Sequence, residues 1–180
     1  MPPSIAELHE CLRLDAATGR LYWKARPRSH FTSDQTWAAI NTRFAGREAF
    51  TAIQTDGYKH STITIRGERH GLLAHRVVFA MHRGSWPKRT VDHKNGDVTD
   101  NKPSNLRNAT KRQQCLNKRT KRTRSSGSLK GAYQSPSGRF YAQIRANGVF
   151  HHLGSFDTEQ QANAAYAAAA TKLNGRFARS

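Results

Sequence analysis

The chain has 180 residues, enough for one ordinary domain or two small ones, and its 30 Lys and Arg against 12 Asp and Glu give a formal net charge of +18. This excess favours a polyanionic partner, because each phosphate that a basic side chain neutralises releases condensed counterions. We therefore expect a nucleic acid as the partner. No apolar run approaches the roughly 18 residues of a membrane span, and a signal peptide is absent, so we expect a cytoplasmic protein.

The two cysteines, Cys11 and Cys115, are far apart in the sequence and form no CxxC pair. This spacing excludes both a zinc ribbon and a disulfide framework. We expect both to be reduced and to pack as small hydrophobic side chains.

The first third of the chain predicts a helix and a hairpin. Ser4, with Glu7 three residues later and apolar residues at helical spacing, predicts a short N-terminal helix. A Thr-Gly turn then leads into a strand over residues 21–23, which we expect to pair as a hairpin. Residues 27–55 show no periodicity, and we expect a loop there with one strand at most.

The next elements are a strand and an amphipathic helix. Residues 61–65, STITI, alternate as a half-buried strand does, and a Gly-Glu turn follows them. Apolar residues at helical spacing from Leu73 to Met81 predict the helix. Gly84 and Pro87 are expected to end it.

Residues 91–118, VDHKNGDVTDNKPSNLRNATKRQQCLNK, place Asp92 beside His93. Hydrolysis of a phosphodiester requires an activated water, charge against the phosphorus and a stabilised leaving alkoxide, which a neutral imidazole and one hard divalent ion can supply. Adjacent strand residues point to opposite faces, so the two side chains converge only if the strand ends there. The following KNGD supplies the turn.

The rest of this stretch predicts a returning strand and a helix. NLRNA is interpreted as the strand, and Thr110 with Gln113 three residues later predicts the start of the helix. The helix must pack across the hairpin to bury its apolar stripe, so Gln114 in its first turns is the candidate to share a cation with Asp92. The other interpretation is a polar loop of turn-forming residues.

The segment resembles the HNH endonucleases with the ββα-metal fold, specifically the phage and intron-encoded homing branch. The resemblance implies that Asp92 is a metal ligand, His93 the general base, Asn105 the residue that orients the base and Gln114 the second ligand of one magnesium or manganese ion. It also implies a phage- or prophage-type protein in the cytoplasm of a bacterial host. The family usually carries Asn or His at the position of Gln114, which leaves a weakened or inactive site as an alternative.

A basic run without acidic residues, KRTKRTRSSGS, follows the helix and has the composition of a linker. Its cationic side chains are candidate minor-groove contacts, although a solvated tether is an equal alternative. They are Lys118, Arg119, Lys121, Arg122 and Arg124. The chain then divides into an N-terminal region (1–87), the catalytic unit (88–119), the linker (120–128) and a C-terminal DNA-binding domain (129–180).

The C-terminal part predicts three strands followed by one helix that Thr158 and Gln161 cap. Alternation along the middle strand separates an apolar face from a basic and aromatic face. The apolar face comprises Phe140, Ala142 and Ile144, and the basic and aromatic face comprises Arg139, Tyr141, Gln143 and Arg145. A basic and aromatic face of this kind is often only exposed to solvent, but it also has the groups that a sheet needs to bind in the major groove of DNA.

Residues 131–178 are similar to an AP2/ERF DNA-binding domain, with YAQIR, LGSF and AAYAAAA at that family's landmarks. The similarity implies a three-stranded antiparallel sheet packed on one helix. It also implies DNA contacts from the strands. The candidates are Arg139, Tyr141, Gln143, Arg145 and His152, to which Lys130 is added for its charge.

The sequence as a whole therefore predicts an α+β protein with a central ββα-metal unit. The function expected is that of a site-preferring endonuclease that acts on double-stranded DNA and has no small-molecule substrate. Because the catalytic motif occurs once, we expect it to nick one strand as a monomer. The rival hypothesis is a DNA-binding protein whose catalytic unit has decayed at Gln114.

Overall fold

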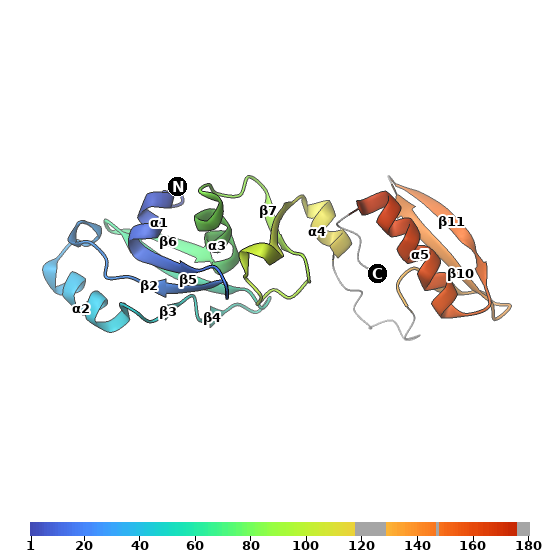
Figure 1. Cartoon of the computed structure of the whole chain (residues 1–180), viewed down its shortest axis with the longest axis horizontal. Helices are drawn as coiled ribbons and strands as arrows, with labels where there is room; N and C mark the ends of the chain where they lie inside the picture. The colour runs from blue at the N-terminus through green and yellow to red at the C-terminus, as the bar shows by residue number, and fades with distance from the viewer. Residues whose placement is uncertain (118–128, 147, 176–180) are drawn as a thin grey trace. The chain divides into compact units, whose positions relative to one another are not determined.

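The computed structural model describes residues 1–117, 129–146 and 148–175 (Figure 1). The chain forms two compact units, Met1–Ala109 and Thr110–Ser180. Both contain helices and strands, so the expected α+β class is confirmed. The predicted linker (120–128) and all five basic side chains proposed as minor-groove contacts lie outside the described ranges. None of the helices within those ranges has the length and apolar character needed to cross a membrane.

The first unit begins with helix α1 (Ile5–Cys11), which starts as predicted. Glu7 N donates to Ser4 Oγ at 3.2 Å, and Ser4 N donates to Glu7 Oε2 at 2.8 Å. These two bonds satisfy backbone donors that the first helical turn leaves without partners. Strands β1 (Leu12–Asp15) and β2 (Arg20–Trp23) follow as the predicted antiparallel hairpin.

Residues 27–55 contain more regular structure than the single strand expected from the sequence. They form η1 (Arg28–His30), α2 (Asp34–Phe44), β3 (Glu48–Ala49) and β4 (Ala52–Ile53). Helix α2 has no buried residue. Its apolar residues Trp37, Ile40 and Phe44 stand at helical spacing but stay half-buried or exposed, and the prediction missed this short stripe.

A second antiparallel sheet is formed by β4, β5 (Lys59–Ile65) and β6 (Glu68–Leu73). The alternating strand at residues 61–65 is confirmed within β5. The predicted helix is also present as α3 (Ala74–Arg83), but Leu73 ends the strand β6 instead of starting the helix. Gly84, with φ of +70°, ends α3 in the left-handed conformation that glycine adopts without strain.

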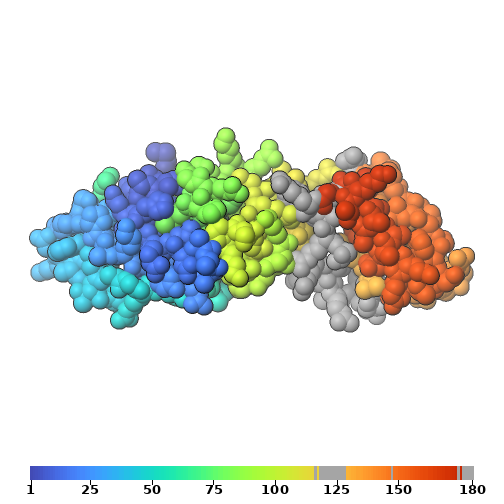
Figure 2. Space-filling model, in the orientation of Figure 1, coloured from blue at the N-terminus to red at the C-terminus, as the bar shows by residue number. Residues whose placement is uncertain are grey.

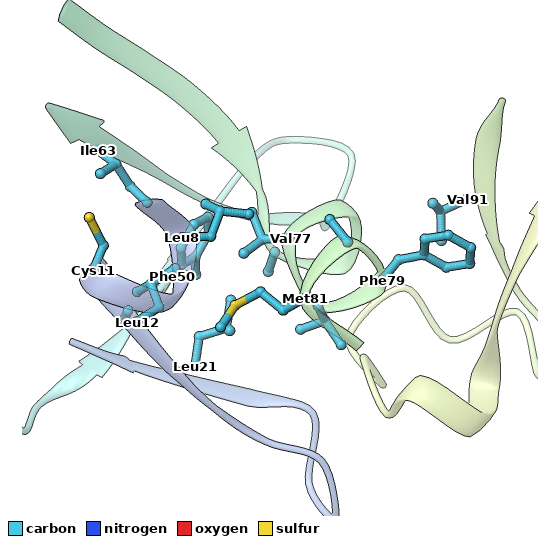
Figure 3. Close-up of a cluster of buried hydrophobic side chains, with 14 of the residues drawn as sticks. Leu8, Cys11, Leu12, Leu21, Phe50, Ile63, Val77, Phe79, Met81 and Val91 are labelled. Atoms are coloured by element: carbon cyan, nitrogen blue, oxygen red, sulfur yellow. The ribbon is translucent and has the colours of Figure 1, made fainter. Parts of the chain in front are cut away.

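The core of the first unit surrounds α3, as Figure 3 shows. Val77 and Val78 are fully buried and pack with Leu8 of α1, Leu21 of β2 and Ile63 of β5. Burial of each such side chain contributes about 1.5 to 3 kcal/mol relative to exposure. The two sheets and α1 are thereby fixed to one helix.

The cysteines have no disulfide, and they differ in environment. Cys11 is fully buried in this core, as expected, and burial raises the pKa of its thiol. Cys115 is exposed, so the expectation that it packs as a small hydrophobic side chain is wrong.

The predicted strand, loop and strand form the end of the first unit. Strand β7 (Thr90–His93) pairs antiparallel with β8 (Leu106–Ala109), and the 3-10 turn η2 (Pro103–Asn105) leads into β8. Val91 and Leu106 belong to the core around α3 and hold the hairpin against it. The hairpin that carries the candidate catalytic residues is thus fixed to the helix that precedes it.

The second unit contains helix α4 (Lys111–Asn117) and the C-terminal sheet. Thr110 N donates to Gln113 Oε1 at 2.8 Å, and Gln113 N donates to Thr110 Oγ1 at 3.2 Å, as the sequence predicts. The predicted three-stranded antiparallel sheet has the order β11-β10-β9. Its strands are β9 (Ala132–Gln134), β10 (Phe140–Ala146) and β11 (Val149–Phe156).

Helix α5 (Glu159–Asn174) packs on one face of this sheet. The predicted cap is present, since Gln161 N donates to Thr158 Oγ1 at 3.3 Å. Ala162 of the helix is fully buried against Ala132 and Ala142 of the sheet. Leu173, near the end of the helix, is half exposed.

Candidate active site

Asp92 and His93 are the last two residues of β7, where the sequence predicts the strand to end. Both side chains are buried, with 4% and 3% of their surface exposed. The chain turns directly after them: Gly96 N donates to His93 O at 2.9 Å, and Gly96 has φ of +70°. A buried carboxylate and a buried imidazole at a strand end require polar partners, because burial without them is costly.

The partner of Asp92 comes from the neighbouring strand. The register sets Asp92 directly opposite Arg107 of β8. Arg107 Nε donates to Asp92 Oδ2 at 2.8 Å, and Arg107 Nη2 lies 2.8 Å from the same oxygen. Both side chains are at least nine-tenths buried. The charge of Arg107 offsets the cost of burying the carboxylate and fixes its orientation.

The partner of His93 is an amide in the loop between the two strands. His93 Nε2 lies 2.9 Å from Asn101 Oδ1, and Asn101 is itself 4% exposed. Because a carboxamide oxygen only accepts hydrogen bonds, Nε2 carries the proton in the neutral ring and Nδ1 carries the lone pair. Asn101 therefore selects the tautomer of His93.

Asn105 was expected to orient the base, but the structure places its side chain on the loop. Asn105 Nδ2 donates to Asn95 Oδ1 at 3.0 Å and to Asp100 O at 2.7 Å, and Asn95 N donates to Asn105 Oδ1 at 3.1 Å. Asn101, absent from the sequence-based site, is the residue whose side chain contacts the imidazole. Asn105 ties together the loop that contains Asn101, and its role in orienting His93 stays a prediction.

Two further rings enclose His93, and no pattern in the sequence indicated their proximity. His75 of α3 lies edge-on to His93 with ring centroids 5.3 Å apart, and Tyr58 lies 4.8 Å from His75 and 6.0 Å from His93. From the sequence, His75 is interpreted as a packing or phosphate-contacting residue. Burial lowers its pKa to about 3, with a smaller contribution from His93, so His75 is neutral at physiological pH.

Gln114 lies in the first turns of α4, as predicted, but α4 belongs to the second compact unit. Its side chain is half-buried, and its backbone N donates to Thr110 O at 2.9 Å. The joint role of Asp92 and Gln114 as metal ligands stays a prediction. On the same helix, Asn117 is 4% exposed and also carries an amide oxygen.

The donor chemistry of these residues suits a hard cation. Carboxylate and amide oxygens are the ligands that magnesium and manganese accept. Among the described residues, no three His, Cys, Asp or Glu side chains gather closely enough to hold a metal ion by themselves. A cation at Asp92 would therefore take its remaining ligands from amide, phosphate or water oxygens.

The segment that contains these residues is similar to known proteins. Residues 72–115 match the family model described as HNH endonuclease. That segment of the chain is similar to the HNH endonucleases. An uncharacterized HNH endonuclease of Acanthamoeba polyphaga mimivirus is 35% identical over 88 residues, which cover 49% of this chain and 44% of that protein. The chain thus spans less than half the length of this relative.

A solved structure of the HNH homing endonuclease I-HmuI, which describes DNA binding and cleavage by that enzyme, is also similar to this chain. The similarity covers 61% of this chain and 52% of that one, with 24% identity and a TM-score of 0.42. The HNH-matched segment holds all four residues predicted from the sequence: Asp92, His93, Asn105 and Gln114. It also holds His75, Asn101 and Arg107, which the sequence-based site omitted.

Outside the HNH-matched segment, the exposed face of the C-terminal sheet carries four of the residues expected to contact DNA. Tyr141, Gln143 and Arg145 alternate along β10 with the buried Ala142 and Ile144. The register places Phe150 opposite Arg145 and His152 opposite Gln143, as the alternation predicts. Tyr133 of β9, which the prediction omitted, stacks on Tyr141 with centroids 5.4 Å apart.

Lys130 and Arg139, two of the expected DNA-contacting residues, interact with other side chains of the second unit. The Lys130 ammonium lies 6.0 Å from the ring centroid of Tyr166, a residue of α5, so it is directed to the helix that covers the other face. Arg139 Nη2 lies 3.2 Å from Asp157 Oδ1, in an exposed ion pair. Arg145 packs over the ring of Phe150 at 5.1 Å. On the exposed face of the C-terminal sheet, the described residues thus include fewer cationic groups than predicted. The rings of Phe150, Tyr133 and Tyr141 add aromatic groups to it.

We predict that Arg107→Ala lowers the free energy of unfolding by about 3 to 5 kcal/mol, because it leaves the buried carboxylate of Asp92 without its countercharge. Arg107→Ala combined with Asp92→Asn should recover much of that loss. Urea unfolding followed by Trp fluorescence measures both. Arg20→Ala is the control, since Arg20 forms a solvent-exposed ion pair with Glu48 at 3.8 Å and should contribute less than about 1 kcal/mol. Equal losses for Arg107→Ala and Arg20→Ala would contradict the role assigned to the buried pair.

We predict that His75 makes stability depend on pH. Its pKa falls from 6.5 to about 3 on folding, so between these values the unfolded chain binds a proton that the folded protein does not. Stability is therefore full above pH 6.5 and falls by about 1.4 kcal/mol per pH unit as the pH decreases through this window. His75→Gln should flatten the slope measured by urea unfolding at pH 4 to 7, whereas His82→Gln, at an exposed position of the same helix, should not. Parallel slopes in all three proteins would count against this assignment.

Proposed function

We propose that the protein is a metal-dependent DNA endonuclease of the HNH type that hydrolyses one phosphodiester per encounter. The observation that carries this proposal is the coincidence of two findings. Residues 72–115 match the HNH endonuclease family model, and within them an Asp-His pair ends a strand with its imidazole held at Nε2 by Asn101. The net charge of +18 supports DNA as the substrate.

His93 is the general base in this proposal. With Nε2 protonated toward Asn101, Nδ1 has the lone pair that accepts a proton from the attacking water. The water oxygen then bonds to phosphorus as the bond to the leaving alkoxide breaks. The rings of His75 and Tyr58 lie against His93, and packing against them limits the orientations that His93 can adopt.

Asp92 and Gln114 would hold one divalent cation, magnesium or manganese, through oxygen donors. Bound there, such a cation would offset the charge of the phosphate and of the leaving alkoxide. Arg107 is the residue of this chain that presents the carboxylate, because it holds Asp92 Oδ2 from the opposite strand.

The C-terminal sheet is the DNA-recognition surface in this proposal, as in an AP2/ERF domain. Its exposed face combines cationic groups that bind phosphates with aromatic and amide groups that contact bases. Arg145, Gln143, Tyr141 and His152 share that face, and Tyr133 extends it. The basic side chains of residues 118–124 would add contacts to the DNA backbone, and one copy of the motif favours nicking by a monomer.

A DNA-binding protein without nuclease activity is the second candidate. The observation that favours it is Gln114, whose side chain is one methylene longer than the Asn found in the resembling family. Octahedral coordination by magnesium tolerates little change in distance. In that case the sheet would bind DNA, and the Asp-His hairpin would only stabilise the fold.

We predict that the protein converts supercoiled plasmid to open circles in the presence of magnesium and that His93→Ala abolishes this conversion. Gln114→Asn should keep or raise the rate, since it restores the shorter amide. Gel electrophoresis of time points with magnesium and with EDTA measures the reaction, and a DNA-binding assay confirms that each variant still binds. Intact plasmid with normal binding for wild type would establish the second candidate. Direct conversion to linear DNA would overturn the nicking mechanism.

We predict that Arg145→Ala lowers the preference for the selected DNA site over random DNA, because a base contact contributes about 1 to 3 kcal/mol to discrimination. Lys172→Ala is the matched control: it removes the same charge from an exposed position of α5, the helix on the other side of the sheet. The site would come from selection on a randomised duplex pool, and fluorescence anisotropy at fixed salt would give both affinities. If both variants lose affinity equally for selected and random DNA, the face assigned to recognition is wrong.

A further inference from the structure

The tip of the β1–β2 hairpin touches the loop that positions His93. A Cβ atom added to Gly19 would lie 2.3 Å from Asn101 C, 2.5 Å from Asn101 O and 2.5 Å from Lys102 N. The nearest atoms are backbone, which cannot rotate away as a side chain end can. Figure 2 shows the blue hairpin lying against the yellow-green loop. Glycine at this position therefore permits direct packing of two backbones.

Hydrogen bonds to Asp15 hold the tip of the β1–β2 hairpin. Asp15 closes the turn: Gly19 N donates to Asp15 O at 2.8 Å, Thr18 Oγ1 to Asp15 Oδ2 at 2.7 Å and Ala17 N to Asp15 Oδ1 at 3.0 Å. Leu21, two residues after the tip, is buried in the core around α3. The hairpin is thereby fixed to the same core as the catalytic strand β7.

The loop is fixed from its other side by Asn105, which bonds to Asn95 and to the backbone of Asp100. Asn101 follows Asp100 directly and is 4% exposed. Its backbone meets Gly19, and its side-chain oxygen accepts the hydrogen bond from His93 Nε2 at 2.9 Å. A displacement of the Asn101 backbone would therefore move the hydrogen-bond acceptor of the imidazole.

We propose that Gly19 and Asn101 are positioning residues for His93 and that the N-terminal hairpin is part of the catalytic apparatus. The hairpin sets the position of the Asn101 backbone, and Asn101 sets the tautomer and ring orientation of His93. The hairpin lies outside residues 72–115, the segment that matches the HNH endonuclease model. The effect on catalysis rests on the proposed nuclease function, whereas the effect on the imidazole does not.

Gly19→Ala is the central test, and Gly46→Ala is its matched control. Both glycines have positive φ, +73° and +81°, so alanine strains the backbone equally at either position. Of these two glycines, Gly19 has atoms within 4 Å of the added methyl group, and Gly46 has none. Asp15→Ala is a second hairpin variant that loosens the turn without adding an atom. Asn101→Ala removes the acceptor of His93.

The first readout is the tautomer of His93 in a long-range ¹H–¹⁵N spectrum of protein labelled at histidine, with the signal assigned through His93→Gln. Wild type and Gly46→Ala should show the Nε2–H form. Gly19→Ala, Asp15→Ala and Asn101→Ala should show a mixture of the two tautomers. This readout requires a folded protein but no activity, and Asp15→Ala supports the conclusion if Gly19→Ala unfolds.

The second readout is the single-turnover nicking rate at saturating DNA. Gly19→Ala and Asn101→Ala should lower it by about tenfold to a hundredfold, with DNA affinity within about twofold of Gly46→Ala. A wild type that does not nick would refute the proposed function and leave the tautomer result to decide the inference. An Nε2–H form in Gly19→Ala and Asp15→Ala alike, or equal rates for Gly19→Ala and Gly46→Ala, would overturn it.

Discussion

The antiparallel pairing of β7 with β8 is the constraint on which the candidate site depends. Its register sets Asp92 opposite Arg107 and His93 opposite Leu106. A shift of one residue would direct Arg107 to the other face of the hairpin and leave a buried carboxylate without a countercharge. The same pairing buries Val91 and Leu106 against α3. The apolar residues that stabilise the hairpin therefore also determine which polar residues meet at its end.

The two members of the Asp-His pair are held by different kinds of interaction. Asp92 receives a charged partner from a strand, where the backbone ladder restricts movement. His93 receives a neutral amide from a loop and is flanked by two other rings. A carboxylate as the partner of His93 would favour the protonated ring, whereas an amide acceptor fixes the tautomer without adding charge. A neutral ring with its lone pair on Nδ1 is the form that a general base requires.

The sequence predicted those features that depend on neighbours along the chain. The caps at Ser4, Thr110 and Thr158 each join residues three apart, so the pattern is complete within one helical turn. The end of β7 at His93 was predictable for the same reason, from the turn that follows. Helix α2 was missed because its apolar stripe is short, and β6 was missed because its residues were interpreted as a turn and the start of a helix.

The partners of the site residues were harder to predict, because they come from distant parts of the chain. Arg107 follows from the register of β7 and β8, which depends on the length and path of the intervening loop. Asn101 lies in that loop, and nothing in its spacing from His93 indicates that the two side chains meet. His75 and Tyr58 reach His93 only after α3 has packed on the sheet that holds β5. The local sequence pattern predicted the candidate pair Asp92 and His93, whereas the residues that contact this pair are brought to it by the tertiary fold.

Residues that precede the HNH-matched segment (72–115) make packing contacts that hold this segment in place. Helix α3 starts close to the beginning of residues 72–115, yet its buried face packs on Leu8, Leu21 and Ile63 from the preceding part of the chain. Tyr58 and Gly19 also precede the match, and they contact His93 and the Asn101 backbone. A fragment limited to the matched residues would expose the apolar face of α3 to water and leave the loop without its support. The N-terminal region is thus the structural base of the site, and its sequence is constrained through packing against α3 and through the glycine at the hairpin tip.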